Sequence, residues 1–339
     1  MRQRTLFALA SICLLPVPAS GQTPSIETRK VAMLVDHDGK GFTRAPMSVA
    51  RIANGRFAVT EMNELPLVVD STGRLVKRWP RGDGPGEFRP NAGPARGGKG
   101  DTLFIGNHTG INVFDRNLKF VRFIPVTEIY TGGFFPVDGD FVLAAGKRGI
   151  GTMINSLHVV SASGKVLRSF LSDTLIRPRR GNDPEYGIAP GAGSTIWAWN
   201  IWGHRLERWT MSGRRTQVID AMPAWFVPKD SIYRARIKSV READGLLWVF
   251  SEVPVPDARA RATAALKKSS GEVDARAFPF EQMATSYLEV YAASSGQLLA
   301  GLPINAYGIT LLDDRHFMIY TPSSQETAQL EIWEMKLRR

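Results

Sequence analysis

Three polar side chains occupy similar places in the chain and could together bind a cation. Glu61, Asn107 and Asn200 each close a short apolar run that reads as a β-strand. A hard cation such as Ca²⁺ takes about six oxygen ligands, several of them anionic. One carboxylate and two amides fall short of that set. Capping of strand ends is therefore the favoured interpretation, Ca²⁺ is the alternative, and the sequence predicts no cofactor.

The five histidines lack the close-paired spacing of a zinc site. His108 adjoins Asn107, and His204 follows the strand that ends at Asn200. The candidate ligand-binding set therefore consists of five residues: Glu61, Asn107, His108, Asn200 and His204. The sequence contains no G-x-S-x-G motif, and Cys13 is its single cysteine. The residues therefore predict a binding protein and no catalysis.

The segment 82–88 reads GDGPGEF and allows two interpretations: a phosphate-binding loop or a turn between sheets. It lacks the Lys-Ser/Thr pair of a phosphate loop, and position 87 is Glu where a dinucleotide motif needs glycine. We therefore expect a structural turn built from Gly82, Gly84, Pro85, Gly86, Glu87 and Phe88. Its glycines should allow positive φ, and Glu87 should accept hydrogen bonds from backbone N–H groups. Phe88 should pack in the hydrophobic core between neighbouring sheets.

A strand–turn–strand unit recurs six times and must position these residues. The first strands lie at residues 57–61, 103–107, 141–145, 196–200, 247–251 and 317–321. Each is preceded by a hairpin turn, such as Asn54-Gly55 or Asp244-Gly245, and followed by a second strand, and most by a further short one. Together with the strand that the preceding hairpin implies, this gives about four strands per unit. A four-stranded sheet cannot bury both of its faces alone, but it does so when it packs between two neighbouring sheets. The pattern predicts an all-β, six-bladed β-propeller with four-stranded antiparallel blades, in which an N-terminal strand near residues 28–35 completes the last blade.

Two further features fit this fold. Trp197, Trp199 and Trp248 fall on the first strands of two units, so we expect them to pack between blades. The fifth unit contains an insertion at about residues 254–283 that includes a helical segment, ARARATAALKK. We interpret the insertion as a solvated excursion, or alternatively as a lid or a docking element for a partner.

The segment with Gly82, Gly84, Pro85-Gly86-Glu87-Phe88 and Pro90, followed by residues 101–107 and 111–115, resembles the repeat of NHL-type six-bladed propellers. Residues 203–209 with Ser212-Gly213 match a second repeat. The closest resemblance is to secreted bacterial six-bladed propellers with a GxGPGEF signature. Lactonase-like and gluconolactonase-like propellers hold a cation in the central channel, so the resemblance would place Glu61, Asn107 and Asn200 at the channel mouth.

The N-terminus predicts export. Arg2 and Arg4 precede an apolar segment at residues 6–15, and small residues follow, so we expect a signal peptide at residues 1–21 and one propeller domain at 22–339. Ile12 precedes Cys13 within the apolar segment, which is not the layout of a lipoprotein. No later segment is long enough for a transmembrane helix.

The formal charge of +11, or +9 without Arg2 and Arg4, would suit an anionic envelope surface. Export and the strand-bound aromatic residues argue against nucleic acid as a partner. We therefore expect an exported, monomeric binding or scaffold module for a protein, peptide, glycan or envelope component. The alternatives are a metal-dependent, lactonase-like hydrolase and a purely structural envelope protein.

Overall fold

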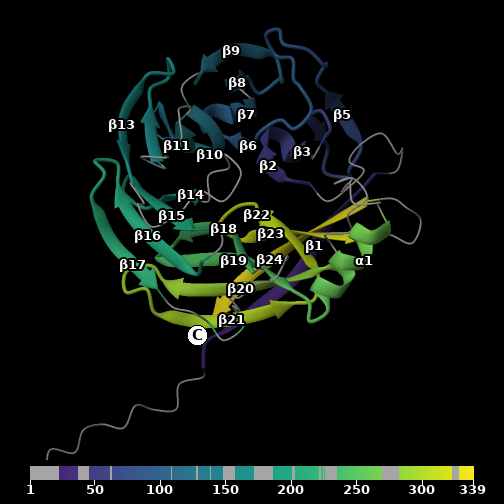
Figure 1. The fold of residues 1–339 in the computed structure, drawn as a ribbon, viewed down its shortest axis with the longest axis vertical. Helices are drawn as coiled ribbons and strands as arrows, with labels where there is room; N and C mark the ends of the chain where they lie inside the picture. The colour runs from purple at the N-terminus through teal and green to yellow at the C-terminus, as the bar shows by residue number, and fades with distance from the viewer. Residues whose placement is uncertain are drawn as a thin grey trace, which may run out of the picture.

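The computed structural model describes residues 23–36, 46–61, 63–107, 109–126, 129–137, 139–147, 157–171, 186–200, 203–220, 223, 225, 235–268, 282–322 and 328–339. Six four-stranded antiparallel sheets stand around a ring, as Figure 1 shows, which confirms the predicted propeller. The predicted signal peptide, His108 and residues 269–281 of the predicted insertion lie outside the described residues.

The strands follow one another from the inner edge of each blade to its rim. Blades 1 and 2 contain β2 (Ser48–Ile52), β3 (Arg56–Thr60), β4 (Leu67–Val69), β5 (Leu75–Arg78), β6 (Ala95–Gly97), β7 (Leu103–Asn107), β8 (Gly110–Phe114) and β9 (Phe120–Pro125). Blades 3 and 4 contain β10 (Ile129–Val137), β11 (Asp140–Lys147), β12 (Leu157–Val160), β13 (Val166–Phe170), β14 (Tyr186–Gly191), β15 (Thr195–Asn200), β16 (Arg205–Thr210) and β17 (Arg215–Asp220). Blades 5 and 6 contain β18 (Arg236–Ala243), β19 (Leu246–Pro254), β20 (Ala284–Ala292), β21 (Leu298–Ile304), β22 (Tyr307–Leu311), β23 (His316–Pro322) and β24 (Ala328–Arg338).

The first strand of the chain closes the ring. β1 (Ser25–Val35) pairs antiparallel with β24 and forms the rim of blade 6. Arg29 and Glu334 form an ion pair across this closure at 2.7 Å. The prediction that an N-terminal strand completes the last blade is therefore confirmed.

Six buried hydrophobic clusters hold the blades together, one at each junction between neighbours. The second strand of a blade contributes to the clusters on both of its faces, which explains its near-continuous apolar sequence. Trp197 is fully buried, and Trp199 and Trp248 are almost so. Their predicted role in packing between blades is confirmed.

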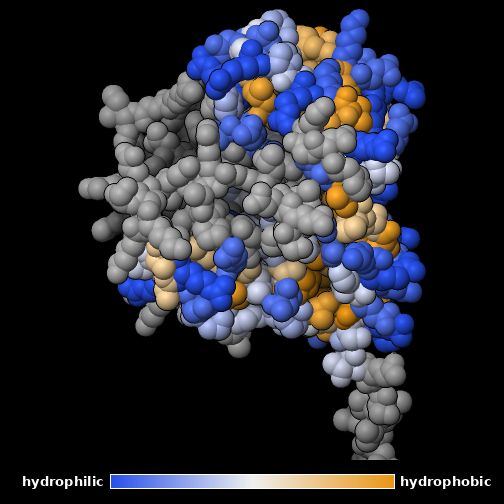
Figure 2. All heavy atoms as spheres, turned by 90° about the vertical axis from the view of Figure 1, so that its right-hand side faces the viewer, coloured by the Kyte–Doolittle hydropathy of each residue, from blue (hydrophilic) through white to orange (hydrophobic). Residues whose placement is uncertain are grey.

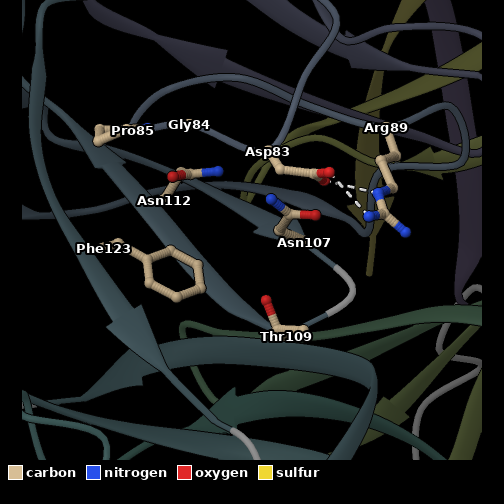
Figure 3. A pocket seen from close by; sticks show the side chains of 8 residues that line it. All are labelled: Asp83, Gly84, Pro85, Arg89, Asn107, Thr109, Asn112 and Phe123. Atoms are coloured by element: carbon tan, nitrogen blue, oxygen red, sulfur yellow. Dashed lines mark hydrogen bonds and ion pairs between the residues drawn. The ribbon is translucent and has the colours of Figure 1, made fainter.

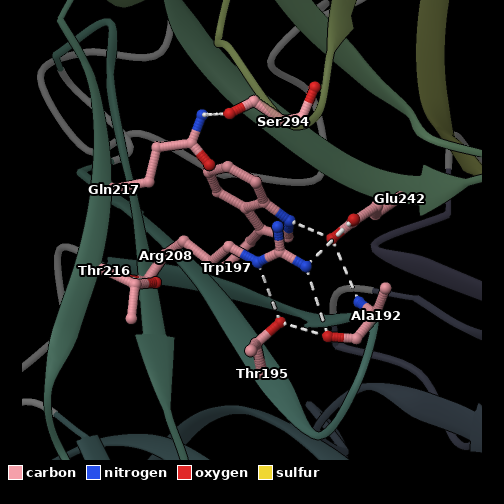
Figure 4. Close-up of polar contacts among 8 residues, drawn as sticks. All are labelled: Ala192, Thr195, Trp197, Arg208, Thr216, Gln217, Glu242 and Ser294. Atoms are coloured by element: carbon pink, nitrogen blue, oxygen red, sulfur yellow. Dashed lines mark hydrogen bonds and ion pairs between the residues drawn. The ribbon is translucent and has the colours of Figure 1, made fainter.

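Long side chains on the rim strands connect each of blades 1 to 4 to the next. Every donor lies on the fourth strand of its blade, and every acceptor is a backbone carbonyl between the third and fourth strands of the following blade. The contacts are Lys77 Nζ to Leu118 O (2.6 Å), Arg122 Nη1 to Ala162 O (3.2 Å), Arg168 Nη1 to Met211 O (2.9 Å) and Gln217 Nε2 to Ser294 O (3.4 Å). The last of these appears at the top of Figure 4.

A buried carboxylate adds a second connection between blades 4 and 5 (Figure 4). Glu242 on β18 accepts a hydrogen bond from the indole Nε1 of Trp197 at 2.7 Å and another from the backbone N–H of Ala192 at 3.0 Å. Its second oxygen pairs with Arg208 Nη2 at 3.1 Å. The charge of Glu242 is thus balanced, and the indole N–H of a fully buried tryptophan has its acceptor.

The helix of the predicted insertion, α1 (Ala258–Lys268), lies between β19 and β20 in the chain. Ala258 and Ala262 are buried in the same cluster as Leu34 and Leu330 of blade 6 and Leu67 of blade 1. The small apolar face of α1 therefore packs where the ring closes, whereas its residues 259–261 and 263–264 are exposed. The sequence did not reveal this contact, since alanine periodicity alone does not show which core a helix joins.

The described surface shows no continuous apolar patch on the side of the ring drawn in Figure 2, where hydrophobic residues are interspersed among hydrophilic ones. Large exposed hydrophobic residues other than Met47, which precedes β2, sit singly or in pairs on rim strands: Val31, Met33, Val76, Val121, Phe123, Leu167, Val218 and Leu298. No helix among the described residues is long and apolar enough to cross a membrane.

Candidate functional site

A pocket of about 450 Å³ opens where blade 2 meets the connection from blade 1. Figure 3 shows its lining, which consists of Asp83, Gly84, Pro85 and Arg89 from the connection and Asn107, Thr109, Asn112 and Phe123 from blade 2. The volume lies in the range of about 300–1,000 Å³ that is common for small-molecule sites. Of the five ligand-binding residues expected from the sequence, only Asn107 is among the lining residues.

Strand register places the polar side chains on one face of blade 2. Asn112 lies opposite Ile105 on one side and Phe123 on the other. Because directly opposed residues point to the same face of a sheet, all three face blade 1. One step deeper, Leu103 lies opposite Phe114 in the core between blades 1 and 2. The face therefore changes from apolar to polar at the pocket.

The GDGPGEF segment forms the wall facing blade 2. Glu87 Oε2 accepts a hydrogen bond from the backbone N–H of Gly84 at 2.8 Å, and Phe88 is fully buried in the core beneath. Both expectations for these residues are confirmed. The segment is a turn between rim strand β5 and inner strand β6, and it also lines the pocket.

The expectation about the glycines is only partly right. Gly86 alone among the three adopts a positive φ, at +76°. Gly82 and Gly84 are needed for space, since a Cβ there would lie 1.9 Å and 2.9 Å from Glu87 Oε2. The two glycines therefore make room for the carboxylate that fixes the turn.

Asp83 and Arg89 form a bidentate pair at the rim of the pocket, visible on the right of Figure 3. Arg89 Nε donates to Oδ1 at 2.6 Å, and Nη2 donates to Oδ2 at 2.8 Å. Hydrogen bonding to Asp83 raises the pKa of the Arg89 guanidinium. Both side chains are largely exposed, so they present polar groups to a ligand and contribute little to the fold.

Asn112 occupies a position that recurs in every blade. The register of the third strands aligns it with Leu67, His158, Glu207, Glu289 and Glu331. The four other polar members bond to neighbouring side chains: His158 to Ser169, Glu207 to Arg205, Glu289 to His204 and Glu331 to Lys30. Asn112 is only 1% exposed, yet its Nδ2 has no hydrogen-bond partner among the described residues.

This orphaned amide is the strongest sign of a binding site. Buried polar groups in native proteins nearly always have partners, and an unpaired one costs about 1–3 kcal/mol. Figure 3 shows the Asn112 side chain among the lining residues, with its amide nitrogen directed toward Asn107 and Asp83. A ligand in the pocket would supply the missing acceptor.

The remaining residues of the candidate set lie elsewhere. Glu61 is buried directly after β3, and Asn200 ends β15. His204 is buried between blades 4 and 5, where its Nε2 lies 2.7 Å from Glu289 Oε2 and its ring meets Trp225 edge-on. Among the described residues, no group of three His, Cys, Asp or Glu side chains is arranged to hold a metal ion.

Sequence reasoning missed Asp83, Arg89, Thr109, Asn112 and Phe123 as a group. The available signal was Asn112 itself, a polar residue between Ile111 and Val113 on the core-facing side of a strand. The pocket contains an aromatic ring, two amides, a hydroxyl and a carboxylate–guanidinium pair. These described side chains offer hydrogen-bond donors and acceptors beside an aromatic surface, which suits recognition of a polar ligand.

The sequence matches no protein-family model and no curated protein. Among solved structures, a member of the DUF4221 family from Bacteroides vulgatus is similar over 92% of this chain and 98% of its own, at 10% identity and a TM-score of 0.61. Virginiamycin B lyase from Staphylococcus aureus aligns with 91% of this chain and 99% of its own, at 11% identity and a TM-score of 0.47. At 10% identity the likeness to the DUF4221 protein shows the propeller fold alone.

Proposed function

We propose that the protein is a binding module whose pocket beside blade 2 takes a carbohydrate. The observation that carries this proposal is the buried Asn112 amide, which has no partner among the described residues and lines the pocket. A hydroxyl group both donates and accepts hydrogen bonds, so a polyhydroxylated ligand complements amides and a carboxylate–guanidinium pair.

Phe123 favours a sugar over a smaller polar ligand. Its ring is 37% exposed on rim strand β9 and lies directly opposite Asn112. A sugar ring has an apolar C–H face and a polar edge, which matches a flat aromatic surface beside hydrogen-bonding groups. The rigid GDGPGEF turn, fixed by Glu87, would hold the opposite wall in place.

No specific observation favours the alternative of a metal-dependent hydrolase. Glu61 and Asn200 do not line the pocket, and only Asn107 of that set does. We therefore keep binding as the proposed function, without catalysis.

The same proposal includes export and an envelope ligand. The support is the leader-like sequence at residues 1–21 and the formal charge of +9 without Arg2 and Arg4, which would attract the protein to an anionic cell surface. The resemblance to NHL-type propellers remains part of this proposal, carried by the GDGPGEF segment and the repeat spacing.

A panel of immobilised oligosaccharides tests the proposed function. The purified wild type should bind at least one of them, and the variants Asn112→Leu and Phe123→Ala should each weaken that binding about tenfold or more, or about 1.4 kcal/mol. Val121→Ala is the matched control, because Val121 is 56% exposed on the same strand but does not line the pocket.

Two results would overturn the assignment. One is a wild-type protein that binds no member of the panel. The other is a carbohydrate whose affinity is the same for the wild type and for both pocket variants, because the ligand would then bind elsewhere on the molecule.

A further inference from the structure

Arg96 is an inner-strand cation with an unusual set of partners. It lies in the middle of β6, the innermost strand of blade 2. Its Nε donates to Phe134 O on β10 of blade 3 at 3.1 Å, and its Nη1 donates to Ser48 Oγ on β2 of blade 1 at 3.3 Å. Nη1 also donates to Ala95 O at 2.9 Å.

These contacts place the guanidinium on the wall of the ring. The sheet of blade 2 separates blade 1 from blade 3, and β6 is the inner edge of that sheet. A side chain of β6 that touches the inner strands of both neighbours must pass around this edge. The guanidinium of Arg96 therefore faces the axis of the propeller.

The partners of Arg96 leave its charge uncompensated within the described residues. An arginine has five N–H donors, and the three bonds to described residues come from Nε and Nη1. All three acceptors are neutral, and Nη2 donates to no described residue. Arg96 is half-buried, and this burial lowers its pKa to about 10 with no nearby anion to oppose the shift.

The other inner-strand arginines differ from Arg96 in this respect. Arg51 on β2 pairs with Asp313 at 3.0 Å, and Arg241 on β18 pairs with Asp314 at 2.6 Å. Buried or half-buried charges are ordinarily paired in this way. Arg96 is instead held by two carbonyl oxygens and a hydroxyl, and its Nη2 donates to no described residue.

The wall opposite blade 2 is also basic. Blade 5 carries Arg236 and Lys238 on its inner strand, and both contact Glu252 Oε2, at 3.0 Å and 3.4 Å. Lys238 sits at a β-bulge, a feature that redirects a side chain. Burial, with the charge of Arg236, lowers the pKa of Lys238 to about 8, so an added negative charge would be favourable on this side too.

We propose that Arg96 is an anion-binding residue on the inner wall of the ring, which takes a phosphate or carboxylate group of a small molecule in the central opening. A guanidinium held by neutral acceptors keeps donors for an oxyanion, and such charge-assisted hydrogen bonds are strong. None of the residues around Arg96 lines the pocket beside blade 2. The site is therefore independent of the proposed carbohydrate site.

Thermal unfolding in matched salts tests the proposal. The purified protein is unfolded in sodium phosphate, sodium acetate and sodium chloride at pH 7 and equal ionic strength. Phosphate or acetate should raise the Tm of the wild type above its value in chloride, because a ligand of the folded state stabilises it. The salt that acts identifies the oxyanion.

The variant Arg96→Met should lose this increment and bind the active anion at least tenfold more weakly in calorimetric titration. Arg241→Met is the matched control, since it removes an inner-strand arginine that is already paired, and it should keep the increment. Arg96→Lys serves if Arg96→Met does not fold, because it retains the charge but loses the fork and should also weaken binding.

The proposal fails if the wild type has the same Tm in all three salts. It also fails if the Arg96 variants respond to phosphate and acetate as the wild type does. Arg89→Met removes the arginine of the other pocket, and loss of the anion response in that variant would place the anion there and refute the assignment to Arg96.

Discussion

The substitution Asn112→Leu should stabilise the folded protein while it abolishes binding at the pocket. Most core substitutions destabilise, so the expected sign is unusual. It follows from the Asn112 amide, which is 1% exposed and whose Nδ2 has no partner among the described residues. Folding removes this amide from water without a protein hydrogen bond in return.

The expected change in the free energy of unfolding follows from the surroundings of Asn112. Removing an unpaired buried donor recovers about 1–3 kcal/mol. Leucine has the same branching as asparagine with slightly larger ends, and overpacking opposes the gain by about 1 kcal/mol. Blade 1 already carries a fully buried leucine, Leu67, at the equivalent position, so the backbone accommodates the side chain. The expected net gain in the free energy of unfolding is about 0–2 kcal/mol, with a central value of about 1 kcal/mol.

Equilibrium unfolding in urea, followed by tryptophan fluorescence, measures this change. The midpoint should move to higher urea with an unchanged slope, and Tm should rise by about 2–4 °C. The matched control is Glu207→Leu at the same position of blade 4, where the carboxylate bonds Arg205 at 2.8 Å and Trp209 Nε1 at 3.1 Å. That variant should lose about 1–3 kcal/mol because its partners are left unpaired.

A loss of stability in Asn112→Leu comparable with that of Glu207→Leu would refute the reasoning. It would mean that the Asn112 amide is satisfied in the folded protein without a ligand. The unpaired donor would then give no reason to place a binding site at this pocket.

Three further expectations concern the residues that hold the blades and the pocket in place. Glu242→Ala should lower the free energy of unfolding by about 3 kcal/mol, because it leaves Arg208 and the Trp197 indole without their acceptor. Glu242→Gln keeps an acceptor and should lower it by about 1 kcal/mol. Equal losses for the two variants in urea unfolding would contradict a stabilising ion pair. Glu87→Ala should weaken binding at the pocket and lower stability by about 1 kcal/mol, and Glu87→Gln should retain most of both in the same assays. Lys238→Met should be more stable relative to wild type at pH 7 than at pH 10.5. The pKa of Lys238 is about 8 in the folded protein against an ordinary 10.5, so its charge disfavours folding by about 3 kcal/mol below pH 8, and this penalty disappears as the pH rises to 10.5. A stability difference that does not change with pH would show that the ammonium is fully compensated.

The fold was predictable because its signal is repeated. Strands such as Leu103–Asn107 are apolar on both faces and recur with a glycine-containing turn after the next strand. The innermost strands did not give such a signal. Ala95–Gly97 is three residues long and contains a charge, so Arg96 could not be assigned to the wall of the ring from sequence.

The pocket was less predictable for a different physical reason. Asn112 and Phe123 are eleven positions apart and meet only through the register of β8 with β9. The turn with Asp83 and Gly84 reaches them only because blade 1 stands against blade 2. The spacing of residues in the sequence indicates the pairing of Asn112 with Phe123 only weakly. It gives no indication that the turn with Asp83 lies beside them.

The closure of the ring by β1 has a consequence for the time course of folding. β1 leaves the ribosome first, but its partner β24 begins at Ala328, about 290 residues later. At about 5–20 residues per second, β1 waits roughly 15–60 s for its only neighbouring strand. Throughout that interval an 11-residue strand with Val31 and Met33 on it has no sheet to join. Such an unpaired edge is a template for aggregation, so the nascent chain is most vulnerable at the segment that later locks the ring.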